Sequence, residues 1–209
     1  MKPNTDSGFL FSYIRFINLS PQGGSLDFYV GNTLVGAGIK FGSYTNYIKT
    51  ATGPQVYKVT RCGRKDEVVE KIVFSQNIGD VHSLCVAGMA DEASFIPVAE
   101  PTSRQNTDYG HLRICNFAPG STRFDVWADD EMILGDIEYK NVSRYMEICP
   151  KSYRLSLFEN KKRVAELGSF EPKKSKYTTL YIAGLKNEMP HLLGVFTLDA
   201  ASFNGFYLL

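Results

Sequence analysis

Short runs in which hydrophobic and polar residues alternate are the strongest local signal in this chain. Residues 26–30 alternate Leu, Phe and Val with Asp and Tyr, and residues 124–128 alternate Phe, Val and Ala with Asp and Trp. A period of two, in runs rich in aromatic and β-branched residues, predicts half-buried β-strands. No segment carries a sustained apolar stripe of helical period, so the pattern predicts an all-β protein.

Turn-forming residues separate these runs at matching places in both halves of the chain. Gly31-Asn32 and Asp129-Asp130 each lie between two predicted strands, where a tight hairpin favours small polar residues. Residues 62–66 and 159–162 predict a second turn in the same way. About seven short strands per hundred residues is typical of an immunoglobulin-like antiparallel β-sandwich. The antibody-type cysteine pair with an intervening tryptophan is absent, so the predicted likeness is one of architecture.

An internal repeat organises the whole sequence. Residues 13–21 match residues 111–119 at a constant offset, and after a loop that is shorter in the second copy the register resumes as far as residues 84–88 and 180–184. The most site-like or structurally specific matched positions are Arg15, Asn18, Pro21, Asp27 and Tyr29 in the first copy, and Arg113, Asn116, Pro119, Asp125 and Trp127 in the second. A match held over this span indicates a duplicated domain.

The boundary between the two copies is expected in residues 99–108. This stretch is polar, contains a proline and has no hydrophobic period, which is the composition of a linker. The sequence therefore predicts two tandem immunoglobulin-like β-sandwiches, residues 1–100 and residues 101–209.

Charge and hydropathy exclude several partner classes. The formal net charge is +1, from 23 basic and 22 acidic residues mixed along the chain, which gives no electrostatic reason to expect a nucleic-acid partner. No run approaches the roughly 18 apolar residues of a membrane helix, so no membrane insertion is expected. Residues 9–11 are too short for the apolar region of a signal peptide, so we expect synthesis in the cytoplasm without one.

The repeated core resembles a known bacterial family. Residues 14–21, Ile-Arg-Phe-Ile-Asn-Leu-Ser-Pro, followed by Leu-Asp-Phe-Tyr-Val at residues 26–30, are similar to the motifs of domain-of-unknown-function family 4397. Asn18 and Asn116 stand where many members have histidine, and Ala118 and Trp127 replace a serine and a tyrosine in the second copy. The resemblance implies tandem immunoglobulin-like sandwiches, frequent on exported or envelope-associated proteins, and it implies no reaction.

Arg15 with Asp27, and Arg113 with Asp125, are the most site-like repeated residues. Strand alternation allows Arg15 and Asp27 to share a face of the sandwich beside Tyr29. One interpretation is a ligand-binding ion pair. The favoured one is structural: an ion pair, or a carboxylate accepting backbone N–H bonds, that fixes the loop at residues 21–25.

The sequence offers no catalytic residues, no cofactor site and no metal site. The acidic run at residues 129–131 is aligned with Gly-Asn-Thr in the first copy, so a turn explains it better than calcium does. The histidines and cysteines lack zinc spacing. One disulfide per domain is one possibility and reduced thiols are the favoured one, for the cysteines Cys62, Cys85, Cys115 and Cys149.

We therefore expect a non-enzymatic protein. The leading hypothesis is a structural or adhesive protein of a bacterial surface or spore-surface assembly, whose partners are copies of itself or other surface proteins. The apolar segments near the two ends are its candidate assembly residues, namely Phe9, Leu10, Phe11, Phe206 and Tyr207. One alternative is an intracellular interaction scaffold. Another is a small-ligand or carbohydrate-binding module using aromatic residues such as Tyr29, Trp127, Tyr44 and Tyr145, for which a groove of stacked aromatic rings would be the evidence.

Overall fold

The computed structural model describes residues 11–90 and 92–203, which form four four-stranded β-sheets. In the first repeat one sheet has the strand order β4-β1-β7-β8 and the other β3-β2-β5-β6. These strands are β1 (Phe11–Asn18), β2 (Leu26–Val30), β3 (Thr33–Ile39), β4 (Ile48–Ala51), β5 (Gly53–Arg61), β6 (Arg64–Gln76), β7 (Val81–Ala87) and β8 (Ser94–Ala99).

The second repeat has the same topology. Its sheets have the orders β12-β9-β15-β16 and β11-β10-β13-β14. The strands are β9 (Gly110–Asn116), β10 (Arg123–Ala128), β11 (Glu131–Glu138), β12 (Met146–Ile148), β13 (Tyr153–Glu159), β14 (Lys162–Phe170), β15 (Tyr177–Ala183) and β16 (Leu193–Leu198), followed by the 3-10 turn η1 (Ala200–Ser202). The predicted all-β duplicated sandwich is confirmed.

The predicted hairpin turns lie where the sequence placed them. Gly31 and Asp129 begin the turns after β2 and β10, with φ angles of 57° and 54°. A type of turn that needs this left-handed conformation selects glycine or a short polar residue, because other side chains collide with the backbone there. The identical strand–turn–strand spacing in both copies follows from this requirement.

One strand pair in each repeat departs from the expected antiparallel arrangement. β1 runs parallel to β7, and β9 runs parallel to β15. A parallel pair needs a long crossover connection, and here the chain passes through the other sheet between the two strands. The sheets next to the partner repeat are therefore mixed.

Each sandwich has its own hydrophobic core between its two sheets. In the first repeat the rings of Phe16 and Phe28 stack across the core with centroids 4.8 Å apart. In the second repeat Ile114 and Val126 occupy the matching positions. These inward-facing positions are the apolar members of the sequence alternation.

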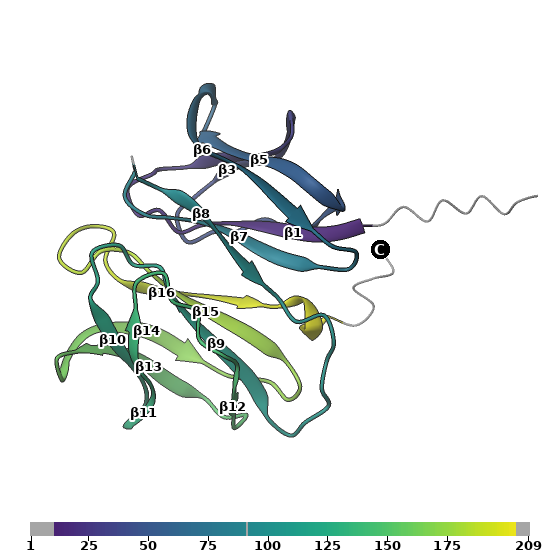
Figure 1. The fold of residues 1–209 in the computed structure, drawn as a ribbon. Helices are drawn as coiled ribbons and strands as arrows, with labels where there is room; N and C mark the ends of the chain where they lie inside the picture. The colour runs from purple at the N-terminus through teal and green to yellow at the C-terminus, as the bar shows by residue number, and fades with distance from the viewer. Residues whose placement is uncertain (1–10, 91, 204–209) are drawn as a thin grey trace, which may run out of the picture.

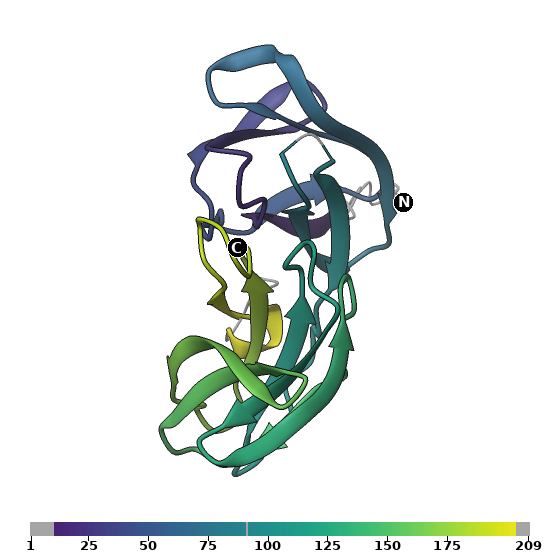
Figure 2. The same cartoon turned by 90° about the vertical axis from the view of Figure 1, so that its left-hand side faces the viewer.

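A third core lies between the two repeats, which we call the seam. The sheets β4-β1-β7-β8 and β12-β9-β15-β16 face each other across it, and the two repeats are stacked one on the other in both views (Figures 1 and 2). Its buried residues are Ile17, Leu19, Cys85, Ala87 and Val98 from the first repeat, and Cys115, Phe117, Tyr181, Ala183 and Val195 from the second. Strands β9 and β15 are accordingly buried on both faces rather than half-buried.

The segment between the repeats runs along the outside. β8 ends at Ala99, β9 begins at Gly110, and residues 102–106 between them are exposed. Within the described residues, no helical segment has the length and hydropathy needed to cross a lipid bilayer.

We predict that trypsin cleaves the native protein first at Arg104, in the exposed linker, and that the two fragments stay together afterwards. The buried seam should hold them in one particle, so denaturing electrophoresis should show two fragments while gel filtration shows no loss of mass. A first cleavage within residues 13–30 would contradict the two-sandwich organisation.

Candidate functional site

Arg15 projects from β1 into the seam and binds the second repeat. Its Nη1 donates to the carbonyl oxygen of Leu198 at 2.8 Å, and its Nη2 donates to Thr197 Oγ1 and Asp199 Oδ1, both at 2.8 Å. Its Nε donates to Ser83 Oγ in its own repeat at 2.6 Å. The guanidinium is thus surrounded by acceptors that are mostly supplied by the other repeat.

Arg113 makes the reciprocal contacts from β9. Its Nη1 donates to the carbonyl oxygen of Ala99 in the first repeat at 2.6 Å, and its Nε and Nη2 donate to Thr179 Oγ1 at 3.1 and 2.9 Å. Leu198 and Ala99 end the equivalent strands β16 and β8. Equivalent residues therefore exchange equivalent bonds, as they do in an isologous interface.

Two carboxylates neutralise the two arginines. Glu100 Oε1 lies 2.9 Å from Arg15 Nη2, and Asp199 Oδ2 lies 3.7 Å from Arg113 Nη2. The hydroxyl of Tyr47 donates to Glu100, and that of Tyr145 donates to Asp199 at 2.5 Å. We call the arginines, these carboxylates and the two tyrosines the clamp.

The clamp is withdrawn from water. Arg15 and Arg113 are 2% and 6% exposed, and Glu100 and Asp199 are 6% and 0% exposed. The tyrosine rings cover the guanidiniums, with Arg15 Cζ 4.8 Å from the Tyr47 centroid and Arg113 Cζ 4.6 Å from that of Tyr145. Buried charges of this kind are tolerated only when they are paired and hydrogen-bonded, as these are.

Burial and neighbouring charges shift the pKa values of the clamp groups. Burial lowers the pKa of Arg15, but Glu100 and neighbouring groups raise it more, so the net shift is upward. Burial, followed by the charge of Glu100, raises the pKa of Asp199 to about 6, against the pull of both arginines. The guanidiniums therefore stay charged, and Asp199 is a clamp group whose raised pKa lies within the pH range that folded proteins commonly tolerate.

Asp27 does not pair with Arg15, contrary to the shared face allowed by the sequence. The two residues lie on different sheets. Asp27 Oδ1 accepts the N–H of Gly38 at 2.7 Å and Oδ2 accepts that of Gly63 at 2.9 Å. Burial raises the pKa of Asp27, but these two bonds outweigh it and the net pKa is lowered. The alternation rule failed here because it describes faces within one sheet.

The carboxylate of Asp27 stabilises a β-bulge between β2 and β3, and not the loop at residues 21–25. Gly38 has a φ of 61°, next to a register shift between β2 and β3. In the second repeat Asp125 Oδ1 accepts the N–H of Asp136, which has a φ of 55°, at 2.9 Å. Both aspartates thus accept backbone N–H bonds beside β-bulges, with different partners in the two repeats.

Asn18 and Asn116 hold the loops instead. Asn18 Nδ2 donates to the carbonyl oxygens of Gly24 and Ile39, both at 2.9 Å, and its Oδ1 accepts the N–H of Ser20 at 3.2 Å. Asn116 bonds the carbonyl oxygen of Ile137 and the N–H of Ala118 in the same way, while its remaining Nδ2 bond goes to the hydroxyl of Ser121; both asparagine side chains are buried. Pro21 and Pro119, in these loops, are buried as well.

The remaining aromatic candidates lie apart from one another. Lys58 Nζ lies 4.5 Å above the ring of Tyr29, and Trp127 packs on Phe158 with centroids 5.1 Å apart. Tyr145 belongs to the clamp, and only Tyr44 of the four residues suggested for sugar stacking lines a large cavity.

The cysteines are free thiols, and Cys85 and Cys115 are buried in the seam while Cys62 and Cys149 are exposed. Burial raises the pKa of Cys115 to about 12, which makes its thiol unreactive. Among the described residues, no group of His, Cys, Asp and Glu side chains is arranged to hold a metal ion.

Of the candidate assembly residues, Phe9, Leu10, Phe206 and Tyr207 lie outside the described residues. Phe11 pairs with Ala51 in β4, and Lys49 Nζ lies 3.7 Å above its ring. Phe11 is therefore part of the sheet of its own repeat.

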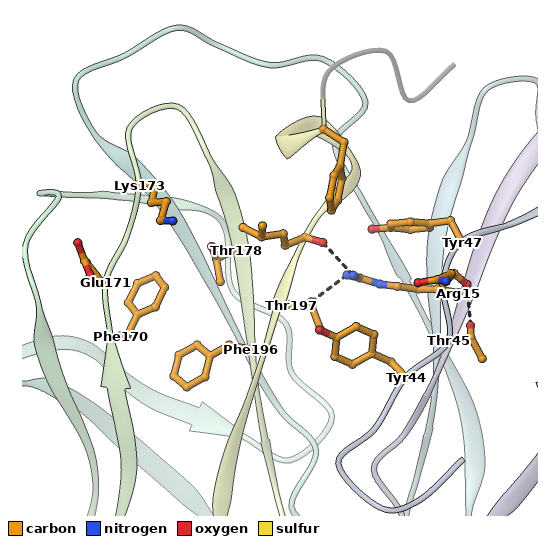
Figure 3. A pocket seen from close by; sticks show the side chains of 13 residues that line it. Arg15, Tyr44, Thr45, Tyr47, Phe170, Glu171, Lys173, Thr178, Phe196 and Thr197 are labelled. Atoms are coloured by element: carbon orange, nitrogen blue, oxygen red, sulfur yellow. Dashed lines mark hydrogen bonds between the residues drawn. The ribbon is translucent and has the colours of Figure 1, made fainter. Parts of the chain in front are cut away.

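A cavity opens along one edge of the seam, beside the clamp. This groove has a volume of about 750 Å³ and is bounded by both repeats. Tyr44 and Tyr47 flank Arg15 on one wall, and Phe170 and Phe196 form the other (Figure 3). The rings of Phe170 and Phe196 stack with centroids 5.3 Å apart. Its full lining is Arg15, Tyr44, Thr45, Asn46, Tyr47, Phe170, Glu171, Lys173, Thr178, Phe196, Thr197, Leu198 and Phe203.

Part of the aromatic lining differs between the two sides of the seam: Tyr47 and Phe170 have the aromatic counterparts Tyr145 and Phe74, whereas Tyr44 and Phe196 have none. The register of the two repeats places Pro97 where Phe196 lies, because Pro97 pairs with Leu84 as Phe196 pairs with Leu180. Counting along the repeat places Val142 at the position of Tyr44. The duplicated fold therefore does not require these aromatic residues, which makes the groove the candidate functional site.

A family model described as Domain of unknown function (DUF4397) matches residues 12–122 and 110–200. The chain belongs to the DUF4397 family. This confirms the resemblance carried by the motif at residues 14–21 in both copies. No curated protein matches this DUF4397 chain significantly.

Similar solved structures are distant. The C-terminal domain of AlgF from P. aeruginosa has 19% identity and a TM-score of 0.35, covering 44% of this chain and 99% of that one. CBMbc (family CBM26) from Eubacterium rectale Amy13K, solved with maltoheptaose, has 9% identity and a TM-score of 0.30, covering 90% of this chain and 95% of that one. The Bacillus anthracis TIE protein has 11% identity and a TM-score of 0.26, covering 84% of this chain and 33% of that one. These TM-scores are too low to inform function.

We predict that Asp27→Ala destabilises this DUF4397 protein by about 1–3 kcal/mol, because two N–H groups lose their acceptor. Asp125→Ala should cost less, since Asp125 accepts one such bond. Urea unfolding of both variants measures the difference. Equal stabilities of Asp27→Ala and the wild type would show that the bulge does not need its carboxylate.

A second prediction concerns pH. The folded-state pKa of Asp199, about 6, lies above its unfolded value, so the folded protein binds this proton more tightly. The group's contribution to the free energy of unfolding therefore falls as the pH rises from about 4 to about 6, and is constant above.

The free energy of unfolding of the wild type minus that of Asp199→Asn should accordingly fall by about 1–3 kcal/mol between pH 4 and pH 7. Urea titrations of both proteins across this range measure it. A difference that instead increases with pH would mean that the two arginines outweigh burial at Asp199.

Proposed function

We propose that this protein is a non-enzymatic binding protein, and that the groove receives an apolar segment of a protein partner. The observation that carries the proposal is the set of three groove aromatics, Tyr44, Phe196 and Phe203, that are replaced by Val142, Pro97 and Arg104 on the equivalent side of the seam. A site that exists in one copy only serves something other than the shared fold. Apolar concave surfaces with few convergent polar groups are the usual form of binding sites.

The chemistry of the groove favours an apolar ligand over a sugar. Sugars need free hydrogen-bonding side chains beside an aromatic platform. The buried polar groups at the base of the groove, Arg15 and Thr197, already bond each other, and Arg15 also bonds Leu198 and Asp199. The stacked Phe170 and Phe196 rings and the ring of Tyr44 form the apolar contact surface, beside the exposed polar residues Asn46, Glu171 and Lys173.

The proposed setting is a bacterial surface or spore-surface assembly, and this part of the proposal rests on the family resemblance. The rigid seam suits that setting, because two domains fixed by a buried interface present the groove in one geometry. Preorganisation of this kind lowers the entropy lost on binding.

The proposal predicts that a displayed peptide library, selected on the wild-type protein, yields sequences rich in aromatic and aliphatic residues. Their affinity should fall at least tenfold in Tyr44→Val/Phe203→Arg, which carries the residues found at the same positions of the other repeat, Val142 and Arg104. The control is Tyr109→Val, which removes an exposed tyrosine outside the groove.

Two results would contradict the proposal. Selected peptides that bind the groove variant as well as the wild type would place the binding surface elsewhere. A glycan array on which the wild type binds and the groove variant does not would assign the groove to carbohydrate instead.

A further inference from the structure

The second repeat continues past the groove into an apolar segment. Phe203 is the last described residue, lines the groove, and meets the ring of Tyr47 edge-on with centroids 6.3 Å apart. The next residues are Asn204-Gly-Phe-Tyr-Leu-Leu209, which include four apolar or aromatic side chains and no charged one. We call residues 204–209 the tail.

The tail is attached at the wall of the groove and is long enough to fill it. Six residues span at most about 20 Å when extended. A segment tethered this closely has an effective concentration in the millimolar range at the site it reaches. Even a weak intrinsic affinity for the groove would therefore keep it occupied.

The tail and the aromatic groove differ between the repeats in the same way. Where the second repeat has Phe203 and the apolar tail, the first repeat continues as Arg-Gln-Asn-Thr-Asp at residues 104–108. The side of the seam that lacks the apolar continuation also has Val142 and Pro97 in place of Tyr44 and Phe196. Two independent departures from the repeat thus coincide on one edge of the molecule.

We infer that the tail occupies the groove of its own chain and is displaced by the partner segment. This inference rests on the proposed function, because it assigns a competitor to the same site. The tail then blocks the groove in the free protein. The apparent affinity for a partner segment depends on the difference between the binding free energies of that segment and of the tail.

The test is disulfide trapping in the full chain. In a background with Cys62→Ser and Cys149→Ser, which removes the exposed thiols, Leu208→Cys is combined either with Lys173→Cys or with Asn46→Cys. These two positions line opposite walls of the groove and are both exposed. The matched control pairs Leu208→Cys with Lys65→Cys, an exposed lysine in the hairpin after β5.

Mild oxidation should give an intramolecular disulfide from at least one groove position and none from the control. The disulfide is detected as a faster-migrating monomer band in denaturing electrophoresis without reductant, and as a linked peptide by mass spectrometry. A disulfide-linked dimer would assign the groove to the tail of a second copy and overturn the inference. Linking no greater than in the control at both positions would overturn it as well.

A second measurement separates this inference from the proposed function. Phe206→Ser/Tyr207→Ser/Leu208→Ser should bind the selected peptides at least tenfold more tightly than the wild type, because the competitor is lost. If Tyr44→Val/Phe203→Arg abolishes peptide binding while the tail variant leaves it unchanged, the groove is a binding site and the inference alone is wrong.

Discussion

The burial of two guanidinium groups is the constraint on which the rest of this structure depends. Arg15 and Arg113 remain charged, so each must find acceptors inside the protein, and the other repeat supplies several of them. Removing one partner from such a pair leaves an uncompensated buried charge, which costs several kcal/mol. The sheets that carry these arginines also carry the apolar side chains of the seam, whose burial keeps these sheet faces away from water. Together these constraints account for strands buried on both faces and for repeats that are packed together rather than strung along a linker.

The clamp is reciprocal but unequal, and the inequality arises from one methylene group. Glu100 directly follows the last strand of the first repeat, and Asp199 directly follows that of the second. The longer Glu100 reaches Arg15 at 2.9 Å, so Arg15 contacts both carboxylates, whereas Asp199 lies 3.7 Å from Arg113. The more strongly held arginine is the one that lies at the base of the groove. The groove wall is therefore fixed by the same bonds that join the repeats.

Local pattern was enough to predict the strands, the turns and the duplication, because period two and turn chemistry are properties of neighbouring residues. It also identified Arg15, Asn18 and Asp27 as special. It did not identify their partners, since Arg15 bonds residues more than 180 positions away and strand alternation carries no information about another sheet. One available signal was missed: β7 and β15 each end in four consecutive apolar or aromatic residues, 84–87 and 180–183, without alternation, which is typical of strands covered on both sides.

Duplication explains how a binding groove can arise without disturbing the clamp. Every residue that the fold needs is present in both copies: the arginines, the loop asparagines and the bulge aspartates. The groove residues Tyr44 and Phe196 have no aromatic counterpart. They line the groove beside Arg15, whose hydrogen bonds go to the carbonyl oxygen of Leu198 and to the buried carboxylate of Asp199. Substitutions at the groove rim therefore leave the charged interface paired. The two equivalent edges of the seam are free to diverge, and the edge that became aromatic is the one next to an apolar continuation of the chain.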